Sequence, residues 1–283
     1  KRMNAIVAFS VAVLWMLLPD LISPTVQIYG LAVLVIFLGL PHGALDPWVA
    51  ERVGLSQTPQ QAVLFNLVYL LIAALVVLTW VWLPVASLMV FLAISAWHFS
   101  GDWAFDMNRL LRLCVGMLLI LMPIAFHTEN VAFIFTQLSG TGGGVLAYEL
   151  AMPAWAIASA MVLLISITSV QRQWLSAFEY AGLLILAYVA SPLVYFALYF
   201  CLLHSPRHLA GLFRYANPKE HTRLLRMALI YTVFTLILMA ALYFLWSDLP
   251  VDSMILRLVF IGLAAVTVPH MMLLAVSDFR VKH

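Results

Sequence analysis

Charged residues are scarce in this chain of 283 residues, since Asp, Glu, Lys and Arg together make up only 9% of it. A soluble globular domain carries about 25% charged residues, so the chain lacks the surface that such a domain presents to water. Hydrophobic residues account for 65% of the sequence, and the mean hydropathy is +1.06. Apolar blocks follow one another along the whole length and leave no room for a separate soluble domain. The composition therefore predicts a single transmembrane domain, residues 1–283.

Cysteine is almost absent as well. The two cysteines, Cys114 and Cys201, both lie inside apolar segments, where a free cysteine usually behaves as a small buried hydrophobic side chain. No CxxC pattern occurs, and no disulfide framework is expected. The net charge is only +2, and no nucleic-acid partner is expected.

The apolar segments have the length of membrane-spanning helices, which need about 20 mostly apolar residues. Prolines mark several of the breaks between segments, as is usual at helix ends. The first segment follows Lys1 and Arg2 as a signal peptide would, but no convincing small-x-small cleavage site precedes Asp20. We therefore interpret it as a retained first helix. The ten predicted spans are residues 4–19, 24–41, 60–82, 84–103, 109–126, 149–168, 174–190, 192–212, 224–246 and 254–276.

The distribution of charge predicts the orientation of these helices, because Lys and Arg are enriched on the cytoplasmic side of a membrane. With ten spans and a cytoplasmic N-terminus, 12 of the 14 basic residues lie on that side. These are Lys1, Arg2, Arg52, Arg109, Arg112, Arg172, Arg214, Lys219, Arg223, Arg226, Arg280 and Lys282. The outer loops instead carry Asp20, Glu129, Glu149, Asp248 and Asp252. We therefore predict an all-α fold, a polytopic integral membrane helical bundle of about ten transmembrane helices with both termini cytoplasmic.

The longest predicted outer segment runs from His127 to Tyr148 and contains the run Gly140-Thr-Gly-Gly-Gly144. No Lys-Ser/Thr follows the glycines and no strand precedes them, so the run does not match a phosphate-binding loop. We expect a flexible loop or a re-entrant segment here.

Five of the eight histidines share one depth in this topology. His42, His98, His204, His208 and His270 all lie in the C-terminal halves of even-numbered spans, which run from the outside to the inside. They therefore converge in the cytoplasmic half of the bilayer. Ionisable residues inside a membrane are costly and usually face an interior functional site.

The spacing of these histidines favours a metal site over interhelical hydrogen bonds, the other use of histidine in membrane bundles. His204 and His208 are four residues apart and share one helical face, and Pro206 between them should kink the helix. Asp46 and Asp102 follow His42 and His98 by four residues, so each carboxylate can accept from the imidazole N–H that does not bind metal. For His270, a ligand role and a structural role both remain open.

Several metals bind imidazole, namely iron, copper, zinc and nickel. Four neutral histidines without a thiolate leave two open positions on a six-coordinate ion, which suits iron(II) with O2 and an alkene. Zinc hydrolysis favours three ligands and a polar substrate. Axial haem ligation does not suit the close pair on one helix, and a diiron desaturase needs more ligands than this chain supplies.

At these positions the sequence resembles a known family, the bacterial and archaeal membrane β-carotene 15,15′-dioxygenases of the Brp/Blh type. Three blocks carry the resemblance: Pro41-His-Gly-Ala-Leu-Asp46, Trp97-His-Phe-Ser-Gly-Asp102 and His204-Ser-Pro-Arg-His208. The pair Pro269-His270 is also similar to the family pattern. The resemblance extends over essentially the whole chain.

The resemblance implies a single non-haem Fe²⁺ held by His42, His98, His204 and His208. The candidates for supporting residues around this ion are Asp46 and Asp102, from their spacing, and His270. It also implies O2-dependent cleavage of the central double bond of β-carotene to two molecules of all-trans-retinal, with a rhodopsin as acceptor. The lipid bilayer of the inner (plasma) membrane would supply the substrate. The aromatic residues near the motifs, which are candidates for lining a polyene tunnel, are Trp97, Phe99, Trp103, Tyr199 and Phe200. The alternative hypothesis is a non-enzymatic one, a membrane metal transporter or a retinal/rhodopsin-assembly partner.

Overall fold

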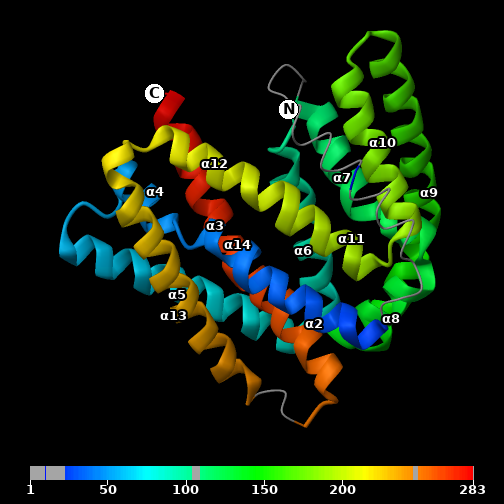
Figure 1. Cartoon of the computed structure of the whole chain (residues 1–283). Helices are drawn as coiled ribbons and strands as arrows, with labels where there is room; N and C mark the ends of the chain where they lie inside the picture. The colour runs from blue at the N-terminus through cyan, green and yellow to red at the C-terminus, as the bar shows by residue number, and fades with distance from the viewer. Residues whose placement is uncertain (1–9, 11–22, 104–108, 245–247, 283) are drawn as a thin grey trace. The chain divides into compact units, whose positions relative to one another are not determined.

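The computed structural model describes residue 10 and residues 23–103, 109–244 and 248–282, and for His42 and residues 278–282 it describes the backbone alone. The predicted span at 4–19 lies outside these residues, except for Ser10. The described residues form helices and no strands (Figure 1), as the all-α prediction requires. They divide into two compact units, unit 1 with residues 1–31 and 88–204 and unit 2 with residues 32–87 and 205–283. The prediction of a single domain stays a prediction.

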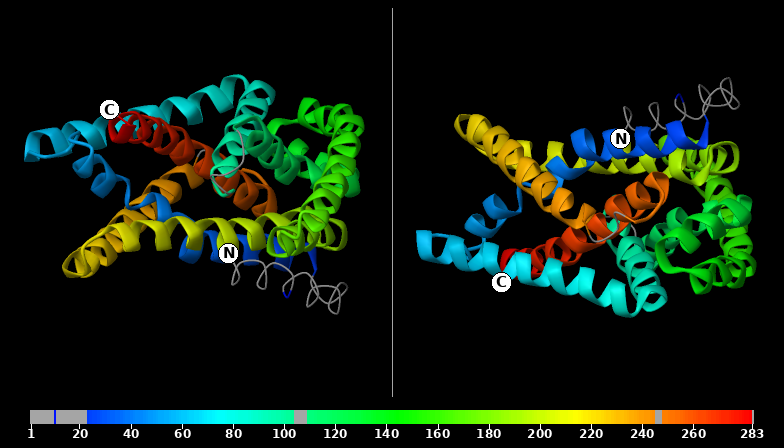
Figure 2. Two further views of the ribbon diagram at one scale, coloured as in Figure 1. Left: turned by 90° about the horizontal axis from the view of Figure 1, so that it is seen from above. Right: turned by 90° about the horizontal axis from the view of Figure 1, so that it is seen from below.

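Unit 1 is built around α9, the longest of its helices. Helix α9 packs against α7, α8 and α10, and α7 also contacts α10 and α11. Both views of Figure 2 show α8, α9 and α10 side by side. The helices of unit 1 are α2 (Pro24–Leu34, through Leu31), α6 (Pro84–Ser100, from Leu88), α7 (Arg109–Phe126), α8 (Thr128–Ser139), α9 (Thr141–Val170), α10 (Trp174–Val189) and α11 (Pro192–Leu198), followed by the π-helical segment η2 (Tyr199–His204).

Glycines allow the close packing of helices in unit 1, and they also correct one prediction. The segment from His127 to Tyr148 is helical rather than a flexible loop, because α8 and α9 are separated only by Gly140, whose φ of +73° suits glycine. A Cβ at Gly143 would overlap the backbone carbonyl of Phe135 on α8. Small residues let membrane helices approach in this way. The glycine run therefore begins a tightly packed helix.

Unit 2 contains the short helices around the first histidine motif and three long helices. Helix α14 packs against α5, α13, α4 and α3, while α12 contacts α3 and η1. The elements of unit 2 are η1 (Val35–Gly39, π-helical), α3 (Leu40–Gly43), α4 (Asp46–Arg52), α5 (Pro59–Trp82), α12 (Ser205–Tyr215), η3 (Pro218–Glu220, 3₁₀), α13 (His221–Tyr243) and α14 (Val251–Lys282).

The apolar face of α4 fixes the position of this helix in unit 2. Trp48 is 1% exposed and packs in a cluster with Leu45, Val49 and Ala50 of the same segment. Leu224 of α13 and Leu273 of α14 complete the contact. Because burial of these side chains holds α4 against both long helices, Asp46 in the first turn of α4 is held in a defined place.

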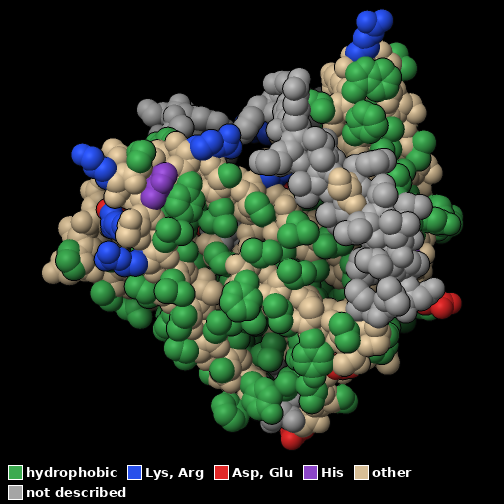
Figure 3. Space-filling view, viewed as in Figure 1, with side chains coloured by type: hydrophobic (Ala, Val, Ile, Leu, Met, Phe, Trp, Pro, Cys, Tyr) green, Lys and Arg blue, Asp and Glu red, His purple; other side chains and the backbone are tan. Residues whose placement is uncertain are grey.

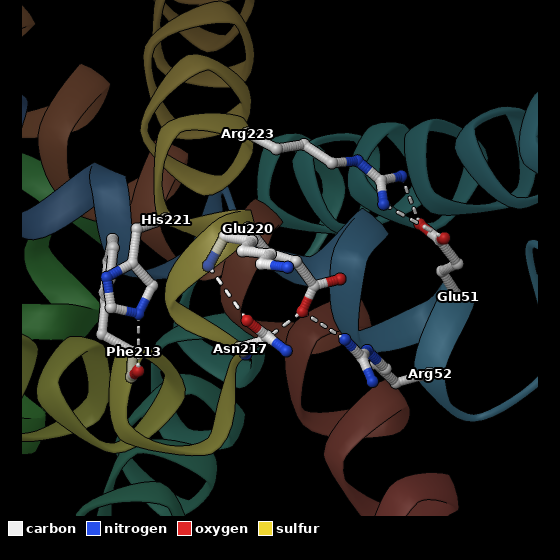
Figure 4. A network of polar contacts seen from close by, with 8 residues as sticks. Glu51, Arg52, Phe213, Asn217, Glu220, His221 and Arg223 are labelled. Atoms are coloured by element: carbon white, nitrogen blue, oxygen red, sulfur yellow. Dashed lines mark hydrogen bonds and ion pairs between the residues drawn. The ribbon is translucent and has the colours of Figure 1, made fainter.

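A polar network lies at the end of unit 2 where α4 meets η3 and α13 (Figure 4). Arg223 donates two hydrogen bonds to Glu51, at 3.2 and 2.5 Å. Arg52 pairs with Glu220, and the guanidinium carbon of Arg52 lies 5.0 Å from the centroid of the Trp48 ring. Exposed ion pairs of this kind add little stability. The network instead links two distant segments of the chain. The paired residues are 168 and 172 positions apart in the sequence.

Two π-helical segments lie just before Pro41 and Pro206 in the histidine motifs. A proline at position i lacks an N–H and crowds the carbonyl of residue i−4. For Pro41 and Pro206 these carbonyls belong to Phe37 and Leu202, which lie inside η1 and η2. The predicted disturbance at Pro206 therefore takes the form of a π-helical segment, a feature that is frequent at functional sites.

Within the described part of the chain, five helical segments are long and apolar enough to cross a membrane: Pro59–Trp82, Arg109–Phe126, Thr141–Val170, Pro218–Tyr243 and Val251–Ser277. Pro24–Gly39, Pro84–Ser100 and Trp174–Val189 are shorter apolar helices. Large hydrophobic side chains are exposed along α13, where the view in Figure 3 shows them covering the surface. The structure thus agrees with a helical membrane protein.

Candidate functional site

In unit 1, two of the predicted histidines come together. His98, near the end of α6, and His204, the last residue of η2, place their Nε2 atoms 2.9 Å apart. Their ring centroids are 4.5 Å apart. His204 is 2% exposed and His98 is partly buried. The two motifs are therefore adjacent in space, although 106 residues separate them in the chain.

A carboxylate fixes the imidazole of His204 from the other side. Nδ1 of His204 lies 2.9 Å from Oδ2 and 3.0 Å from Oδ1 of Asp102. A carboxylate only accepts hydrogen bonds, so Nδ1 carries the proton and donates. The Nε2 atom of His204 then keeps its electron pair, which is the form of histidine that binds a metal ion.

Tyr199 adds a third group to this chain of hydrogen bonds. Its hydroxyl donates to Oδ2 of Asp102 at 2.6 Å. Tyr199 and His204 are the first and last residues of η2, and the i→i+5 pattern of a π-helix brings residues five apart into closer register than an α-helix does. Both side chains therefore reach the same carboxylate.

Aromatic rings surround His204. The ring of Phe200 stacks on His204, with centroids 5.6 Å apart and an interplanar angle of 15°. The ring of Phe99 meets the ring of His204 edge to face, with centroids 4.9 Å apart. It also meets the ring of Tyr199 edge to face, with centroids 5.1 Å apart. Three of the predicted aromatic residues thus lie next to the histidines, buried to 5% exposure or less.

The other two predicted aromatic residues lie elsewhere. Trp103 is buried and packs on Tyr180 of α10, at 5.1 Å between centroids. Trp97 is 68% exposed. It therefore lies on the surface, although its neighbours in the chain face inward.

In unit 2, a second histidine is held in the same manner as His204. Nδ1 of His270 on α14 lies 2.7 Å from Oδ1 of Asp46, and the hydroxyl of Tyr69 on α5 donates to Oδ2 of the same carboxylate at 2.9 Å. His270 and Asp46 are each 2% exposed. The ring of His208 on α12 lies 5.4 Å from that of His270. Both carboxylates therefore contact a histidine from a distant segment. The predicted contacts of Asp46 with His42 and of Asp102 with His98 stay predictions.

The backbone of His42 lies in α3, but its side chain is outside the described part of the structure. Ser205, at the start of α12, donates a hydrogen bond to the carbonyl of Leu38 in η1. This bond joins the segment before His42 to the segment before His208 within unit 2.

His127 is half-buried at the turn between α7 and α8. Its Nε2 atom donates to the carbonyl of Ala187 at 3.1 Å. Burial lowers the pKa of His127 from its usual value of 6.5. The residue has a structural contact and takes no part in the histidine groups described above.

The residues fit a metal ion of the kind that imidazole binds. Two nitrogens held about 2.1 Å from one ion, at right angles, lie about 3.0 Å apart, close to the 2.9 Å between the Nε2 atoms of His98 and His204. A direct hydrogen bond between two imidazoles has a similar length. Among the described residues of each unit, no group of three or more His, Cys, Asp or Glu side chains gathers at metal-binding distance. The described histidines that the structure brings together are one pair in each unit, His98 with His204 and His208 with His270.

Sequence reasoning identified every histidine and carboxylate of these groups, but missed Tyr69. Tyr69 lies in the apolar run of α5, 23 residues after Asp46. A tyrosine in such a run is usually packing or an interfacial anchor, so no local signal distinguishes it.

Comparison with known proteins supports the resemblance seen at the histidine motifs. The chain is 33% identical over 253 residues to the β-carotene 15,15′-dioxygenase of the uncultured marine bacterium 66A03, an alignment that covers 85% of this chain and 90% of that protein. No solved structure matches the chain. The name of this relative does not support the alternative hypothesis of a membrane metal transporter. A sequence model of the β-carotene 15,15′-dioxygenase family matches residues 33–278, and the chain belongs to this family.

Proposed function

We propose that the protein is a membrane-embedded, O2-dependent, non-haem iron dioxygenase that cleaves the central 15,15′ double bond of β-carotene to two molecules of all-trans-retinal. The observation that carries the proposal is the pair of imidazoles in unit 1. Their Nε2 atoms are 2.9 Å apart, and a carboxylate holds the far nitrogen of His204. The aromatic rings of Phe99 and Phe200 lie against His204 of this pair.

The proposed ligands of Fe²⁺ are His42, His98, His204 and His208. His204 and His208 lie four residues apart on continuous helical backbone, which suits two ligands of one ion. The chemistry that iron supplies when bound is the activation of O2 beside the central double bond of the substrate. Four neutral imidazoles leave positions for that purpose.

The residues around His204 have separate tasks. Asp102 holds the proton on Nδ1, so that the imidazole keeps its orientation and its Nε2 electron pair. Tyr199 donates to the same carboxylate and holds it in place. The rings of Phe99 and Phe200 keep water from the histidines and offer an apolar wall against which a polyene can lie.

The membrane has a role as reservoir in this proposal. β-Carotene is a long hydrocarbon that partitions into the bilayer, and a helix bundle can admit it sideways. The retinal product is also apolar, and a rhodopsin is the proposed acceptor. The proposal therefore needs no channel that admits substrate from water.

The proposed topology has ten spans in the inner (plasma) membrane, with both termini cytoplasmic. It is supported by the polar network of Figure 4, in which the segment with Glu51 and Arg52 meets the segment with Glu220 and Arg223. Charge segregation assigns both segments to the cytoplasmic side. Their contact within unit 2 supports a position on the same side of the membrane.

The activity is tested by expressing the protein in a bacterial host that accumulates β-carotene. We expect the orange colour to fade and retinal to appear in a stoichiometry of two per β-carotene consumed, as chromatography of the extracted pigments would measure. The matched control is His204→Ala, which should bind less iron and leave the pigment intact. Persistent colour in cells that contain iron-loaded wild-type protein would overturn the proposed activity.

A further inference from the structure

His270 has the same chemical surroundings in unit 2 as His204 has in unit 1. Each histidine places Nδ1 on an aspartate, at 2.7 Å for His270 and 2.9 Å for His204. Each aspartate also accepts a hydrogen bond from a tyrosine hydroxyl, at 2.9 Å from Tyr69 and 2.6 Å from Tyr199. Both histidines are 2% exposed. A Tyr–Asp–His arrangement thus occurs twice, from unrelated helices.

The contacts of Tyr69 fix more than the carboxylate. Its hydroxyl lies 2.9 Å from Asp46 and 3.0 Å from the carbonyl of Val266. Val266 lies one helical turn before His270 on α14. Tyr69 therefore ties α4 and α14 together at the level of His270, and it restrains both the aspartate and the helix that carries the histidine.

The neighbour of His270 is also a histidine. The rings of His208 and His270 are 5.4 Å apart and meet at 72°. In unit 1 the neighbour of His204 is His98, at 4.5 Å and 69°. Each unit thus contains two imidazoles edge to face, one of which is held by an aspartate and a tyrosine.

From this correspondence we propose that His270 is a further metal-binding histidine, and that Asp46 and Tyr69 are its positioning residues. Asp46 keeps the proton on Nδ1 and leaves the Nε2 electron pair available for the metal ion. Tyr69 restrains the carboxylate by hydrogen bonding. The inference rests on the proposed function only in assuming that these histidines bind a metal ion.

The experiment uses the full-length protein in detergent, stripped of metal by a chelator and titrated with Co²⁺. The affinity for Co²⁺ and the visible absorption of the bound ion are measured, because this absorption reports the ligands directly. The variants are His270→Gln and Tyr69→Phe. The matched control is His221→Gln, which changes a histidine of unit 2 that contacts the carbonyl of Phe213.

We expect His270→Gln to weaken Co²⁺ binding by more than about 10-fold and to change the absorption spectrum. Tyr69→Phe should weaken binding by about 10-fold, at the low end of the range for residues that orient a ligand, with a smaller spectral change. His221→Gln should match the wild type in both measurements. Wild-type affinity and spectrum in His270→Gln would overturn the inference.

Failure of this inference can be told apart from failure of the proposed function. If the wild type binds Co²⁺ and shows the expected variant pattern but makes no retinal, the inference stands and the proposed activity falls. If the wild type makes retinal and His270→Gln binds Co²⁺ normally, the inference alone falls. Should His270→Gln fail to fold, Tyr69→Phe decides, because unchanged affinity and spectrum in that variant would also overturn the inference.

Discussion

At the scale of single residues, the two aspartates of the histidine motifs have the clearest tasks. Asp102 accepts hydrogen bonds from His204 and Tyr199, and Asp46 accepts from His270 and Tyr69. A carboxylate among apolar helices is costly unless its oxygens are hydrogen-bonded. Both carboxylates have such partners, so their cost is offset by contacts that also select the tautomer of a histidine.

Asp102→Asn tests this task in unit 1. We expect retinal formation to fall by about 10- to 100-fold, because an amide can donate to Nδ1 of His204 and so favour the wrong tautomer. Retinal production by purified protein and bound iron per chain are the measurements.

Glu129→Gln is the matched control for Asp102→Asn, since it removes an exposed carboxylate of unit 1 at the start of α8. It should retain full activity. Wild-type activity and iron content in Asp102→Asn would contradict the proposed contact.

At the scale of helices, glycine and proline determine where the histidines lie. Gly116 on α7 has no room for a Cβ, because that atom would overlap the carbonyl of Ala96 on α6. Helix α6 is therefore held close to α7 at Ala96, two residues before His98. Pro206 follows η2, whose π-helical register lets Tyr199 and His204 share Asp102.

Gly143→Ala tests the packing of α8 on α9. The added Cβ would overlap the backbone carbonyl of Phe135, and backbone cannot move aside as a flexible side chain can. We expect a loss of stability of about 1–3 kcal/mol, as is usual for overpacking, seen as a lower midpoint of thermal unfolding in detergent.

Gly211→Ala is the control for Gly143→Ala, because an added Cβ at Gly211 on α12 meets nothing within 4 Å. Alanine favours a helix over glycine by about 0.5–1 kcal/mol, so this variant should unfold at the same temperature as the wild type or slightly higher. An unchanged midpoint for Gly143→Ala would show that the two helices separate easily.

At the scale of the whole molecule, the scarcity of charge and the placement of the basic residues define the relation to the membrane. Among the residues that the structure describes, five helical segments have the length and hydropathy of a membrane span, and three more are apolar but shorter. Ion pairs join Glu51 to Arg223 and Arg52 to Glu220, in two segments that are both predicted to be cytoplasmic.

The proposed topology predicts which positions react with a membrane-impermeant maleimide in intact cells. Glu129→Cys should be labelled from outside, whereas Lys219→Cys should be labelled only after the membrane is made permeable. The native Cys201 is buried and Cys114 is partly buried, so a variant without either cysteine provides the background. Labelling of Lys219→Cys in intact cells would refute a cytoplasmic position for this loop.

The sequence by itself determined the chemical groups of this protein and several of its helices, although not α4 or α8. Hydrophobic runs of about 20 residues and prolines at their ends predicted helices at 60–82, 109–126 and 174–190, and the structure has α5, α7 and α10 within two residues of these bounds. Such runs are local, so they can be recognised without knowledge of the fold. The histidines were found for a related reason, since an ionisable residue in an apolar helix stands out at any position.

Only the tertiary structure decided which of these groups meet. The folded chain places His204 on Asp102 and His270 on Asp46, 102 and 224 residues away, and spacing along one helix cannot predict such contacts. For the same reason Tyr69 escaped notice, and the packing role of the glycine run at 140–144 was not predicted. A tyrosine becomes a hydrogen-bond donor to Asp46, and a glycine becomes a packing residue against α8, only through the helix that lies beside it.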